Sequence, residues 1–276
     1  MAAMSEQYRL INRVGIVGAG IMGIGIAETM AAAGLTVVIF DQFPGKAEAS
    51  KQELAKRLDS RVSRGKLDSD TAAGVLDRIT PVDALGDLAE ANLVIEAVVE
   101  DIGVKRELIA ALEKCLPPEA IIATNTSSLS VTAIAGKAQN PQRIAGFHFF
   151  NPVPLMRVVE VIKAALTDAR VLDVLKELAV RVGHRPVMAS DTPGFIVNHA
   201  GRAYGTEALA MIRENIADFT TIDAILRDAA GFRMGPFELL DLTGLDVSHP
   251  VMEAIYGQYY HEPRYRPSVI TRQRLD

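Results

Sequence analysis

The sequence predicts an α/β fold, in which a doubly wound, mostly parallel sheet is followed by an all-helical C-terminal domain. Short apolar runs rich in β-branched residues alternate with helical patterns over the first two thirds of the chain, which is typical of such a sheet with helices on both faces. Beyond Asp191-Thr192-Pro193-Gly194 the strand-like runs stop. We therefore expect two domains, over residues 1–189 and 190–276.

The first domain should contain short buried strands and longer helices. In the second helix, Leu54, Leu58 and Val62 recur every fourth residue and form an apolar stripe. The predicted helices are Ile21–Ala33, Pro44–Arg64 and Val104–Cys115. The predicted strands are Val14–Val17, Thr36–Phe40, Leu93–Ala97, Ala120–Ala123, Ile144–Phe149 and, after a reversal at Asn151–Pro154, Met156–Ile162.

The second domain shows helical periodicity over Phe195–Met211, Thr221–Ala230 and Phe237–Leu240. The chain ends on PSVITRQRLD, which carries no helix stop signal. We therefore expect this domain to be truncated.

The composition limits the class of protein. The chain has 276 residues, of which 49% are hydrophobic, so it can build a large core. Its net charge of −5 argues against a nucleic-acid partner. A single cysteine, Cys115, fits a reducing compartment. The opening MAAMSEQYRLINR resembles no signal peptide and should be a disordered start, and no apolar run is long enough for a membrane span. We expect a soluble cytoplasmic protein that is not associated with a membrane.

The stretch VGAGIMG places glycines in G-x-G-x-x-G spacing between the first predicted strand and helix, the context that a dinucleotide-binding turn requires. Such glycines permit a tight turn, the approach of a pyrophosphate and close helix packing, while the helix N-terminus offers free N–H groups to the phosphates. The Rossmann-like cofactor contacts predicted here are Gly18, Gly20, Ile21, Met22 and Gly23.

Asp41 ends the next predicted strand. A carboxylate there accepts hydrogen bonds from ribose hydroxyls and repels a 2′-phosphate, so it favours NAD over NADP. The alternative is a tight βα turn followed by a helix-capping aspartate.

His148 and Glu160 lie in apolar segments on either side of Asn151–Pro154. Alone, His148 would read as a core residue and Glu160 as a solvated one. If the two strands run antiparallel, the side chains fall within about a diagonal of each other. A carboxylate fixes the tautomer of an imidazole and stabilises its protonated form, so the pair predicts a general base.

The run TNTSS (Thr124–Ser128) follows a predicted strand, at the edge where doubly wound sheets bind ligands. Ser127 could donate a hydrogen bond to a substrate oxygen, although turn and N-cap roles are the alternative. Asn198, near the domain junction, is uninformative alone.

These motifs together resemble the 3-hydroxyacyl-CoA dehydrogenase family. The resemblance extends from Val14 to about Pro267 and rests on VGAGIMG, DLAEANLVIEAVVED, TNTSSLSVTAIA, GFHFFNPVPLMRVVEV, DTPGFIVN and GFRMGPFELLDLTGLD, in that order. RLDSRVSRGKLD looks most like longer bacterial members that act on 3-hydroxyadipyl-CoA in phenylacetate breakdown.

The resemblance implies roles for individual residues. His148 matches the catalytic base and Glu160 its partner, while Ser127 and Asn198 match residues that hold the substrate oxygen. Ser127 is also expected near both cofactor and CoA ester. Further matches to NAD contacts are Glu100, Lys105 and Asn151, and matches to contacts with coenzyme A are Arg57 and Arg64.

Arg57, Arg61 and Arg64 lie at i, i+4 and i+7, on one flank of a helix. Guanidinium groups suit the phosphates of coenzyme A; without the resemblance, a solvated basic edge would be favoured. Two departures from the family are His199, where an Arg is usual, and the absence of a C-terminal Gly/Lys-rich stretch.

The expected reaction is the reversible, NAD-dependent oxidation of a 3-hydroxyacyl-CoA, as in β-oxidation, in a cleft between the two domains. The family's helical domain forms a dimer interface, so a homodimer is expected. No metal site is expected. Two alternatives are an NAD-linked dehydrogenase of a free hydroxy acid and a non-enzymatic structural protein on the same scaffold.

Overall fold

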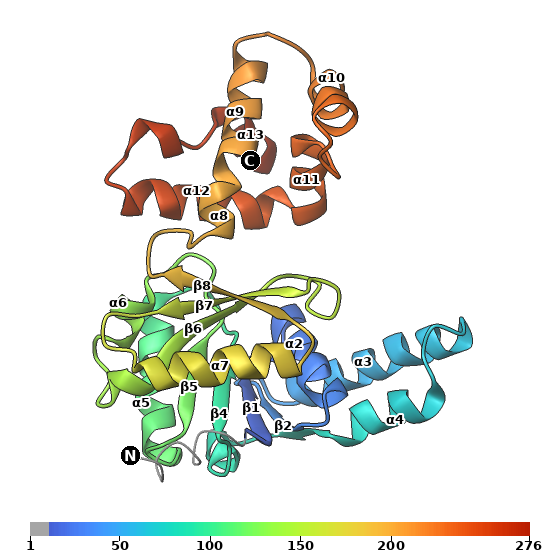
Figure 1. Ribbon diagram of the computed structural model, residues 1–276, viewed down its shortest axis with the longest axis vertical. Coiled ribbons are helices and arrows are strands. Elements are labelled where there is room, and N and C mark those ends of the chain that lie inside the picture. The colour runs from blue at the N-terminus through green and yellow to red at the C-terminus, as the bar shows by residue number, and fades with distance from the viewer. Residues whose placement is uncertain (1–10) are drawn as a thin grey trace. The chain divides into compact units, whose positions relative to one another are not determined.

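The computed structural model describes residues 11–276, which form two compact units (Figure 1). The first unit holds the chain up to Thr126 together with Ser130–Asp191, and the second holds Ser127–Leu129 together with Thr192–Asp276. Most of the segment predicted to be a disordered start lies outside the described residues.

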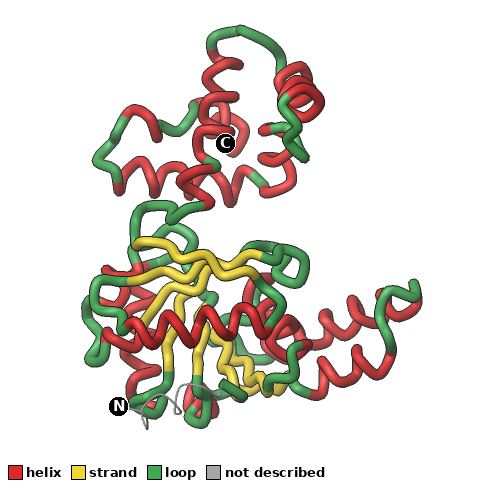
Figure 2. Tube along the Cα trace, in the orientation of Figure 1, coloured by secondary structure: helices red, strands yellow, loops and turns green. Residues whose placement is uncertain are grey.

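The first unit contains a sheet in the order β3-β2-β1-β4-β5-β6-β7-β8 (Figure 2). Strands β1 to β6 pair in parallel, β7 is antiparallel to β6, and β8 is parallel to β7. The chain winds outward from the β1–β4 pair in both directions, so the predicted doubly wound sheet is confirmed. The strands are β1 (Arg13–Val17), β2 (Thr36–Phe40), β3 (Ile79–Val82), β4 (Leu93–Glu96), β5 (Ile121–Thr124), β6 (Ile144–Phe149), β7 (Val158–Lys163) and β8 (Arg185–Ser190).

Helices cover both faces of this sheet. On one face of the sheet, a hydrophobic core contains residues of the strands and of four helices: α2 (Ile21–Ala32), α3 (Lys46–Ser63), α4 (Ser69–Asp77) and α7 (Ala169–Arg181). The other face carries α5 (Ile102–Cys115) and α6 (Val131–Ala135). The α3–α4 hairpin extends outward from the sheet (Figure 1). Short 3₁₀ turns are η1 (Leu85–Leu88) and η2 (Pro141–Arg143).

The two edge strands, β3 and β8, were not predicted from the sequence, and their composition explains why. Central parallel strands are buried on both sides and read as apolar runs. By contrast, β3 carries Pro81, which suits an edge, and β8 begins with Arg185 and is mostly half-buried or exposed. Neither edge strand gives the apolar signal that revealed the central ones.

The second unit is helical, as expected. It comprises α8 (Val197–Ala200), α9 (Arg202–Arg213), α10 (Phe219–Ala224), the π-helical turn η3 (Ile225–Ala229), α11 (Pro236–Thr243), α12 (Leu245–Gln258), the 3₁₀ turn η4 (Pro263–Tyr265) and α13 (Val269–Leu275). The single helix predicted over Phe195–Met211 is wrong in detail. Phe195 has φ +48° and lies outside the helix, and the helical segment is interrupted at Gly201, between α8 and α9. The core of the unit contains Ala208, Leu209, Ile222, Phe237 and Met252.

Candidate functional site

The glycine turn links β1 to α2, and two of its glycines are required by the protein's own atoms. Gly18 has φ +98°, and a Cβ there would lie 2.6 Å from the Ala97 carbonyl oxygen. A Cβ at Gly23 would lie 1.7 Å from the Gly18 carbonyl oxygen. No atom outside its chain neighbours lies within 4 Å of a Cβ built on Gly20. The space at Gly20, at the start of α2, is therefore open to a phosphate group.

Asp41 braces this turn. Its Oδ2 accepts a hydrogen bond from the Ala19 backbone N–H at 2.7 Å, and its Oδ1 accepts one from the Phe43 N–H at 3.0 Å. It does not cap the following helix, whose N-cap is Gly45. A carboxylate has about four acceptor positions, so two remain for ribose hydroxyls. The turn and Asp41 together fit NAD.

A buried polar network lies at the carboxyl ends of β4 and β5. Glu96 and Lys105 are 0% and 1% exposed, and the Lys105 Nζ donates to both Glu96 oxygens, at 3.0 and 2.9 Å. Glu100 lies 3.5 Å from the same Nζ and accepts a hydrogen bond from the Thr126 hydroxyl at 2.6 Å. The Thr124 hydroxyl also donates to Glu96. The ammonium group of Lys105 is thus held inside the protein, where it helps to fix Glu100.

His148 and Glu160 face each other directly across β6 and β7. His148 Nδ1 lies 2.7 Å from Glu160 Oε2, and the residues are 5% and 0% exposed. The antiparallel pairing was predicted, but the register places the pair opposite each other and not on a diagonal. The neighbouring Phe147 and Phe149 point into the core shared with α2 and α7, so His148 and Glu160 point to the other face of the sheet.

The pairing assigns the protons of His148. An ionised Glu160 only accepts hydrogen bonds, so Nδ1 carries the hydrogen and Nε2 is the basic nitrogen of the neutral ring. The ring packs against Phe150, with centroids 4.4 Å apart. Asn125 Oδ1 accepts a hydrogen bond from the Phe149 N–H at 2.8 Å and so ties the end of β5 to the end of β6. The exposed Asn151 follows β6.

Ser127 and Asn198 are brought together within the second unit. The Asn198 Nδ2 donates to the Ser127 carbonyl oxygen at 3.0 Å. Gln258, which the sequence analysis did not single out, donates to the neighbouring Ser128 carbonyl at 2.7 Å. The backbone of this short segment is therefore held by two side-chain amides from distant parts of the chain.

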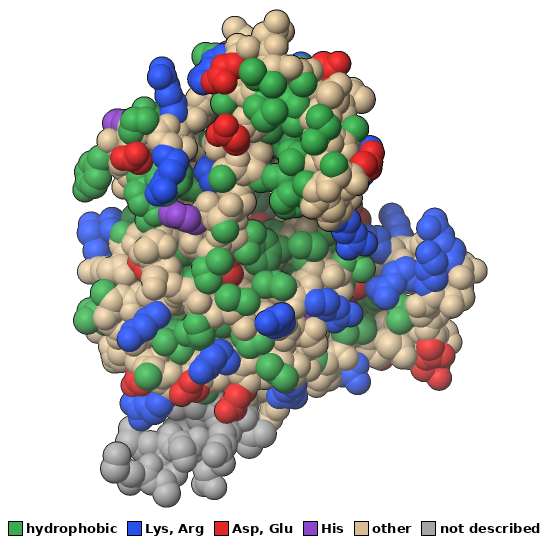
Figure 3. All heavy atoms as spheres, turned by 45° about the horizontal axis from the view of Figure 1, so that its top comes forward, with side chains coloured by type: hydrophobic (Ala, Val, Ile, Leu, Met, Phe, Trp, Pro, Cys, Tyr) green, Lys and Arg blue, Asp and Glu red, His purple; other side chains and the backbone are tan. Residues whose placement is uncertain are grey.

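Arg57 and Arg64 occupy different environments on α3. Arg57 Nη2 lies 3.7 Å, and Arg61 Nη1 3.1 Å, from the carboxylate of Glu28 on α2, which is 7% exposed. Burial raises the pKa of Glu28 above its usual value, while Arg57 and Arg61 act in the opposite direction. Arg64 is exposed at the end of α3. Figure 3 shows basic side chains gathered over the α3–α4 projection.

Several of these partners gave only faint signals in the sequence. Glu28 stands in IAETMAA and Glu96 in LVIEA, each an acid within an apolar run. Such a position indicates a buried partner, but the partners of Glu28, Arg57 and Arg61, lie about thirty residues further along the chain. Asn125 lies within TNTSS, where nothing distinguishes its role.

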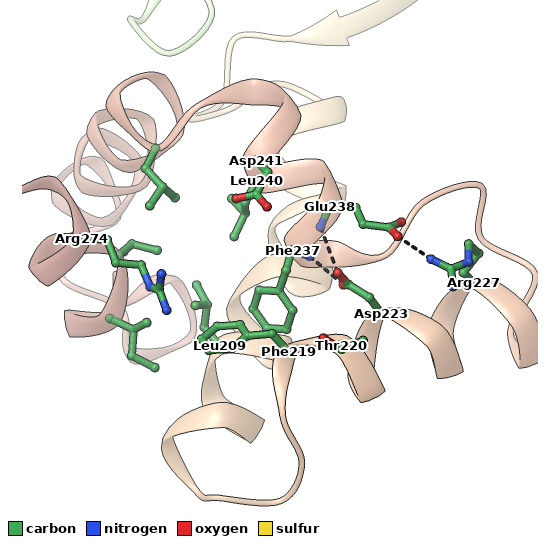
Figure 4. Close-up of a pocket in the computed structure, with 13 residues that line it drawn as sticks. Leu209, Phe219, Thr220, Asp223, Arg227, Phe237, Glu238, Leu240, Asp241 and Arg274 are labelled. Atoms are coloured by element: carbon green, nitrogen blue, oxygen red, sulfur yellow. Dashed lines mark hydrogen bonds and ion pairs between the residues drawn. The ribbon is translucent and has the colours of Figure 1, made fainter.

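The second unit also contains a pocket of about 460 Å³ between α9, α10, α11 and α13 (Figure 4). Several of its charged side chains pair within the unit. Asp223 accepts hydrogen bonds from the Phe237 and Glu238 N–H groups, and Arg227 pairs with Glu238. The Arg274 guanidinium lies 5.0 Å from the Phe219 ring. These contacts explain the pocket as part of the packing of α10 against α11.

No helix within residues 11–276 combines the length and apolarity needed to cross a bilayer. No group of three or more His, Cys, Asp or Glu side chains in the same part of the chain is arranged to hold a metal ion.

Both units match family models. The model of the 3-hydroxyacyl-CoA dehydrogenase NAD binding domain matches residues 13–192, and that of the C-terminal domain of the same family matches residues 194–276.

Individual proteins are similar over nearly the whole chain. The 3-hydroxyadipyl-CoA dehydrogenase of Escherichia coli is 43% identical over 95% of this chain, which spans only 55% of that protein. The mitochondrial hydroxyacyl-coenzyme A dehydrogenase of Sus scrofa is 38% identical over 97% of this chain and 87% of that protein.

A solved structure agrees with these matches. The crystal structure of (S)-3-hydroxybutyryl-CoA dehydrogenase from Ralstonia eutropha superposes with a TM-score of 0.92 at 34% identity, covering 96% of this chain and 94% of that one. The matches therefore extend over both units, and the chain belongs to the 3-hydroxyacyl-CoA dehydrogenase family.

Proposed function

We propose that the protein catalyses the reversible, NAD-dependent oxidation of a 3-hydroxyacyl-CoA to a 3-oxoacyl-CoA. The observation that carries the proposal is the buried His148–Glu160 pair, 2.7 Å apart, in a unit that matches the family's NAD-binding domain. A neutral imidazole backed by a carboxylate is a general base suited to removing the proton of an alcohol.

In this mechanism the Nε2 of His148 takes the proton of the 3-hydroxyl group. The charge that develops on the ring is stabilised by Glu160 across the 2.7 Å contact. Ser127 and Asn198 hydrogen-bond the same substrate oxygen and orient it. Bound NAD would supply the acceptor for the hydride that leaves C3.

The glycine turn and Asp41 hold the cofactor in this proposal. The open position at Gly20 would hold the pyrophosphate, and the remaining acceptor positions of Asp41 would hold the ribose hydroxyls. Glu100, Lys105 and Asn151 are further proposed cofactor contacts. Lys105 acts mainly through the carboxylates beside it, because its ammonium group is buried against Glu96.

The arginines of α3 favour a CoA ester over a free hydroxy acid as substrate. We assign the nucleotide phosphates to Arg64 first, because Arg57 already pairs with Glu28. The Escherichia coli relative is named for 3-hydroxyadipyl-CoA and the Ralstonia eutropha one for 3-hydroxybutyryl-CoA, so short and dicarboxylic acyl chains are the first to test.

The deciding experiment follows NADH absorbance with acetoacetyl-CoA and, separately, with free acetoacetate. We expect turnover of the CoA ester, with a kcat/KM at least about tenfold above that of the free acid, which corresponds to about 1.4 kcal/mol. Preference for the free acid would favour the hydroxy-acid alternative. If neither acetoacetyl-CoA, nor free acetoacetate, nor the CoA ester with an adipyl chain is turned over, the alternative of a non-enzymatic structural protein is favoured.

We also propose that the chain forms a homodimer through its helical unit and acts in the cytoplasm. The single cysteine and the bacterial relatives support the location.

A further inference from the structure

His199 lies at the centre of an aromatic cluster in the helical unit. Its Nδ1 is 3.1 Å from the Tyr259 hydroxyl and its Nε2 is 3.2 Å from the Tyr265 hydroxyl. The two tyrosine rings stack on each other, with centroids 4.4 Å apart and planes inclined by 17°. Tyr265 is 3% exposed. Both ring nitrogens of His199 are therefore engaged by phenols.

The donors and acceptors of this cluster balance when His199 is neutral. Arg264 donates to the Tyr265 hydroxyl at 2.7 Å, so the Tyr265 hydroxyl in turn donates a hydrogen bond to His199 Nε2. His199 Nδ1 then carries a hydrogen and donates a hydrogen bond to the Tyr259 hydroxyl. Burial raises the pKa of Tyr259, so that phenol stays protonated. An arginine at position 199 would offer no acceptor and would add a second guanidinium beside Arg264. The two phenols thus account for a histidine at this position.

The same two chain segments hold the backbone of Ser127 and Ser128. Asn198 precedes His199 and donates to the Ser127 carbonyl, while Gln258 precedes Tyr259 and donates to the Ser128 carbonyl. The His199–Tyr259 hydrogen bond joins the second members of these two pairs. This hydrogen bond therefore helps to fix the distance between the side-chain amides of Asn198 and Gln258, which donate to the carbonyl oxygens of consecutive residues.

We propose that His199 is a positioning residue for Asn198 and Ser127, acting through Tyr259 and Tyr265. The inference rests on the proposed function, in which Asn198 and Ser127 hydrogen-bond the substrate oxygen. Loss of the cluster frees α8 from α12 and from the turn η4, so the two oxygen-binding residues lose their fixed geometry. A misplacement of about 1 Å can cost on the order of a hundredfold in rate.

The test compares two substitutions of His199. His199→Phe keeps an aromatic ring but removes both hydrogen bonds, whereas His199→Gln keeps one donor and one acceptor. We expect His199→Phe to lower kcat by about tenfold to a hundredfold with KM for NAD unchanged, and His199→Gln to recover most of that loss. Tyr260→Phe is the matched control for phenol removal, because Tyr260 is 94% exposed, and it should leave kcat unchanged.

Hydrogen exchange read by mass spectrometry supplies a readout independent of activity. His199→Phe should speed exchange in peptides covering Ser127–Leu129 and residues 192–200, with the rest of the helical unit unchanged. The faster exchange is expected even if the wild type turns over no CoA ester. That lack of turnover would overturn the proposed function but not the role of the cluster in holding the backbone.

Wild-type kcat and wild-type exchange in His199→Phe would overturn the inference. If that substitution unfolds the whole helical unit, Tyr265→Phe decides, since it removes one hydroxyl only. Raised exchange in the two peptides of Tyr265→Phe supports the role of the cluster, and unchanged exchange and kcat overturn it.

Discussion

The His148–Glu160 pair explains how a sheet can hold two ionisable residues in its interior. A buried carboxylate without a partner costs several kcal/mol or shifts its pKa until it is neutral. Here the imidazole N–H satisfies Glu160 at 2.7 Å, and the carboxylate in turn orders the ring. Removing either partner breaks this contact, so the pair is open to test by single substitutions.

His148→Ala should lower kcat by roughly 10²–10⁴, because a general base contributes about that much. Glu160→Gln should also lower kcat, since the protonated ring loses its counter-charge. Steady-state kinetics with acetoacetyl-CoA measures both, and Glu53→Gln on the exposed side of α3 is the control. Wild-type turnover in His148→Ala would refute the role assigned to the pair.

If the proposed activity holds, Asp41 should give the protein at least about a tenfold preference for NAD over NADP in kcat/KM, or about 1.4 kcal/mol. The reason is repulsion between its carboxylate and a 2′-phosphate. Asp41→Asn removes the charge and keeps one of the two acceptors of the turn, so it should narrow the preference for NAD over NADP. Equal use of the two cofactors by the wild type would contradict the assignment.

At this scale, the sequence predicted residues whose partners are near in the chain or follow a spacing rule. The glycine turn and the His148–Glu160 contact both depend on a local turn. Glu28 was missed because its partners, Arg57 and Arg61, come from a separate helix about thirty residues further along the chain. Glu96 was missed although Lys105 is near in the chain, because a contact between a strand and the following helix obeys no simple spacing rule. A single apolar run with one acid gives no indication of which distant cation will meet it.

Among the elements, α2 and α3 contact each other through the carboxylate of Glu28, whose burial disfavours its ionised form. Glu28 is nearly buried, and Arg57 and Arg61 reach it from α3. Since burial is the largest influence on its pKa, the ionised form is less stable here than in the unfolded chain, despite the two guanidinium groups.

Glu28→Gln should therefore change how stability depends on pH. A carboxyl group with a raised pKa stabilises the folded state fully below its unfolded pKa, 4.5, and loses that contribution as the pH rises through the folded value. The free energy of unfolding of Glu28→Gln, relative to wild type, should rise from about pH 4 to pH 7. Urea titrations at several pH values, with Glu53→Gln as control, measure this. A difference that stays flat or falls with pH would contradict it.

Arg64→Ala should raise KM for the CoA ester and leave KM for NAD unchanged, because Arg64 is exposed at the end of α3. An exposed ion pair contributes roughly 0.2–1 kcal/mol, which is up to about fivefold, and bidentate contacts can exceed this. Adding Arg57→Ala should increase the effect on KM and also destabilise the packing of α3. The control is Arg78→Ala, an exposed arginine just after α4.

Two conditions separate phosphate binding from support of the fold. The effect of Arg64→Ala should shrink at high salt, where the wild-type contact is already screened. It should vanish with a pantetheine thioester, which lacks the nucleotide phosphates. An equal loss with the truncated substrate would mean that these arginines do not hold the nucleotide.

Among the strands, those that are buried on both faces were the ones that could be predicted. The central strands stand out because both faces are covered, and Thr36–Phe40 and Ile144–Phe149 were predicted to the residue. The edge strands β3 and β8 were missed, since half-exposed segments mix polar and apolar residues without a clear period. The helices α4 and α7 were also missed, although α7 buries Val171, Leu175 and Leu178 at helical spacing. The sheet order could be argued only from the general preference for parallel α/β winding.

At the scale of the whole molecule, each unit has its own apolar core, and the helical unit exposes further apolar side chains. Leu239 and Leu242 on α11 are 39% and 70% exposed, and Val247 on α12 is 59% exposed. Figure 3 shows apolar side chains gathered over part of this unit. Groups of large exposed apolar side chains mark interaction sites, which is consistent with the proposed homodimer.

The double substitution Leu242→Lys and Val247→Lys should therefore weaken self-association. Burial of two such side chains contributes about 3 kcal/mol or more, so the dissociation constant should rise by about a hundredfold or more. Analytical ultracentrifugation over a range of concentrations measures it, with circular dichroism to check that the helices remain. Leu166→Lys in the first unit is the control, because Leu166 is 65% exposed but lies outside the helical unit, and it should leave the dimer intact. A wild type that is monomeric at every concentration would refute the dimer itself. A double variant that dimerises as tightly as the wild type would instead place the interface elsewhere on the molecule, since two lysines cannot be buried at an apolar contact without a large cost.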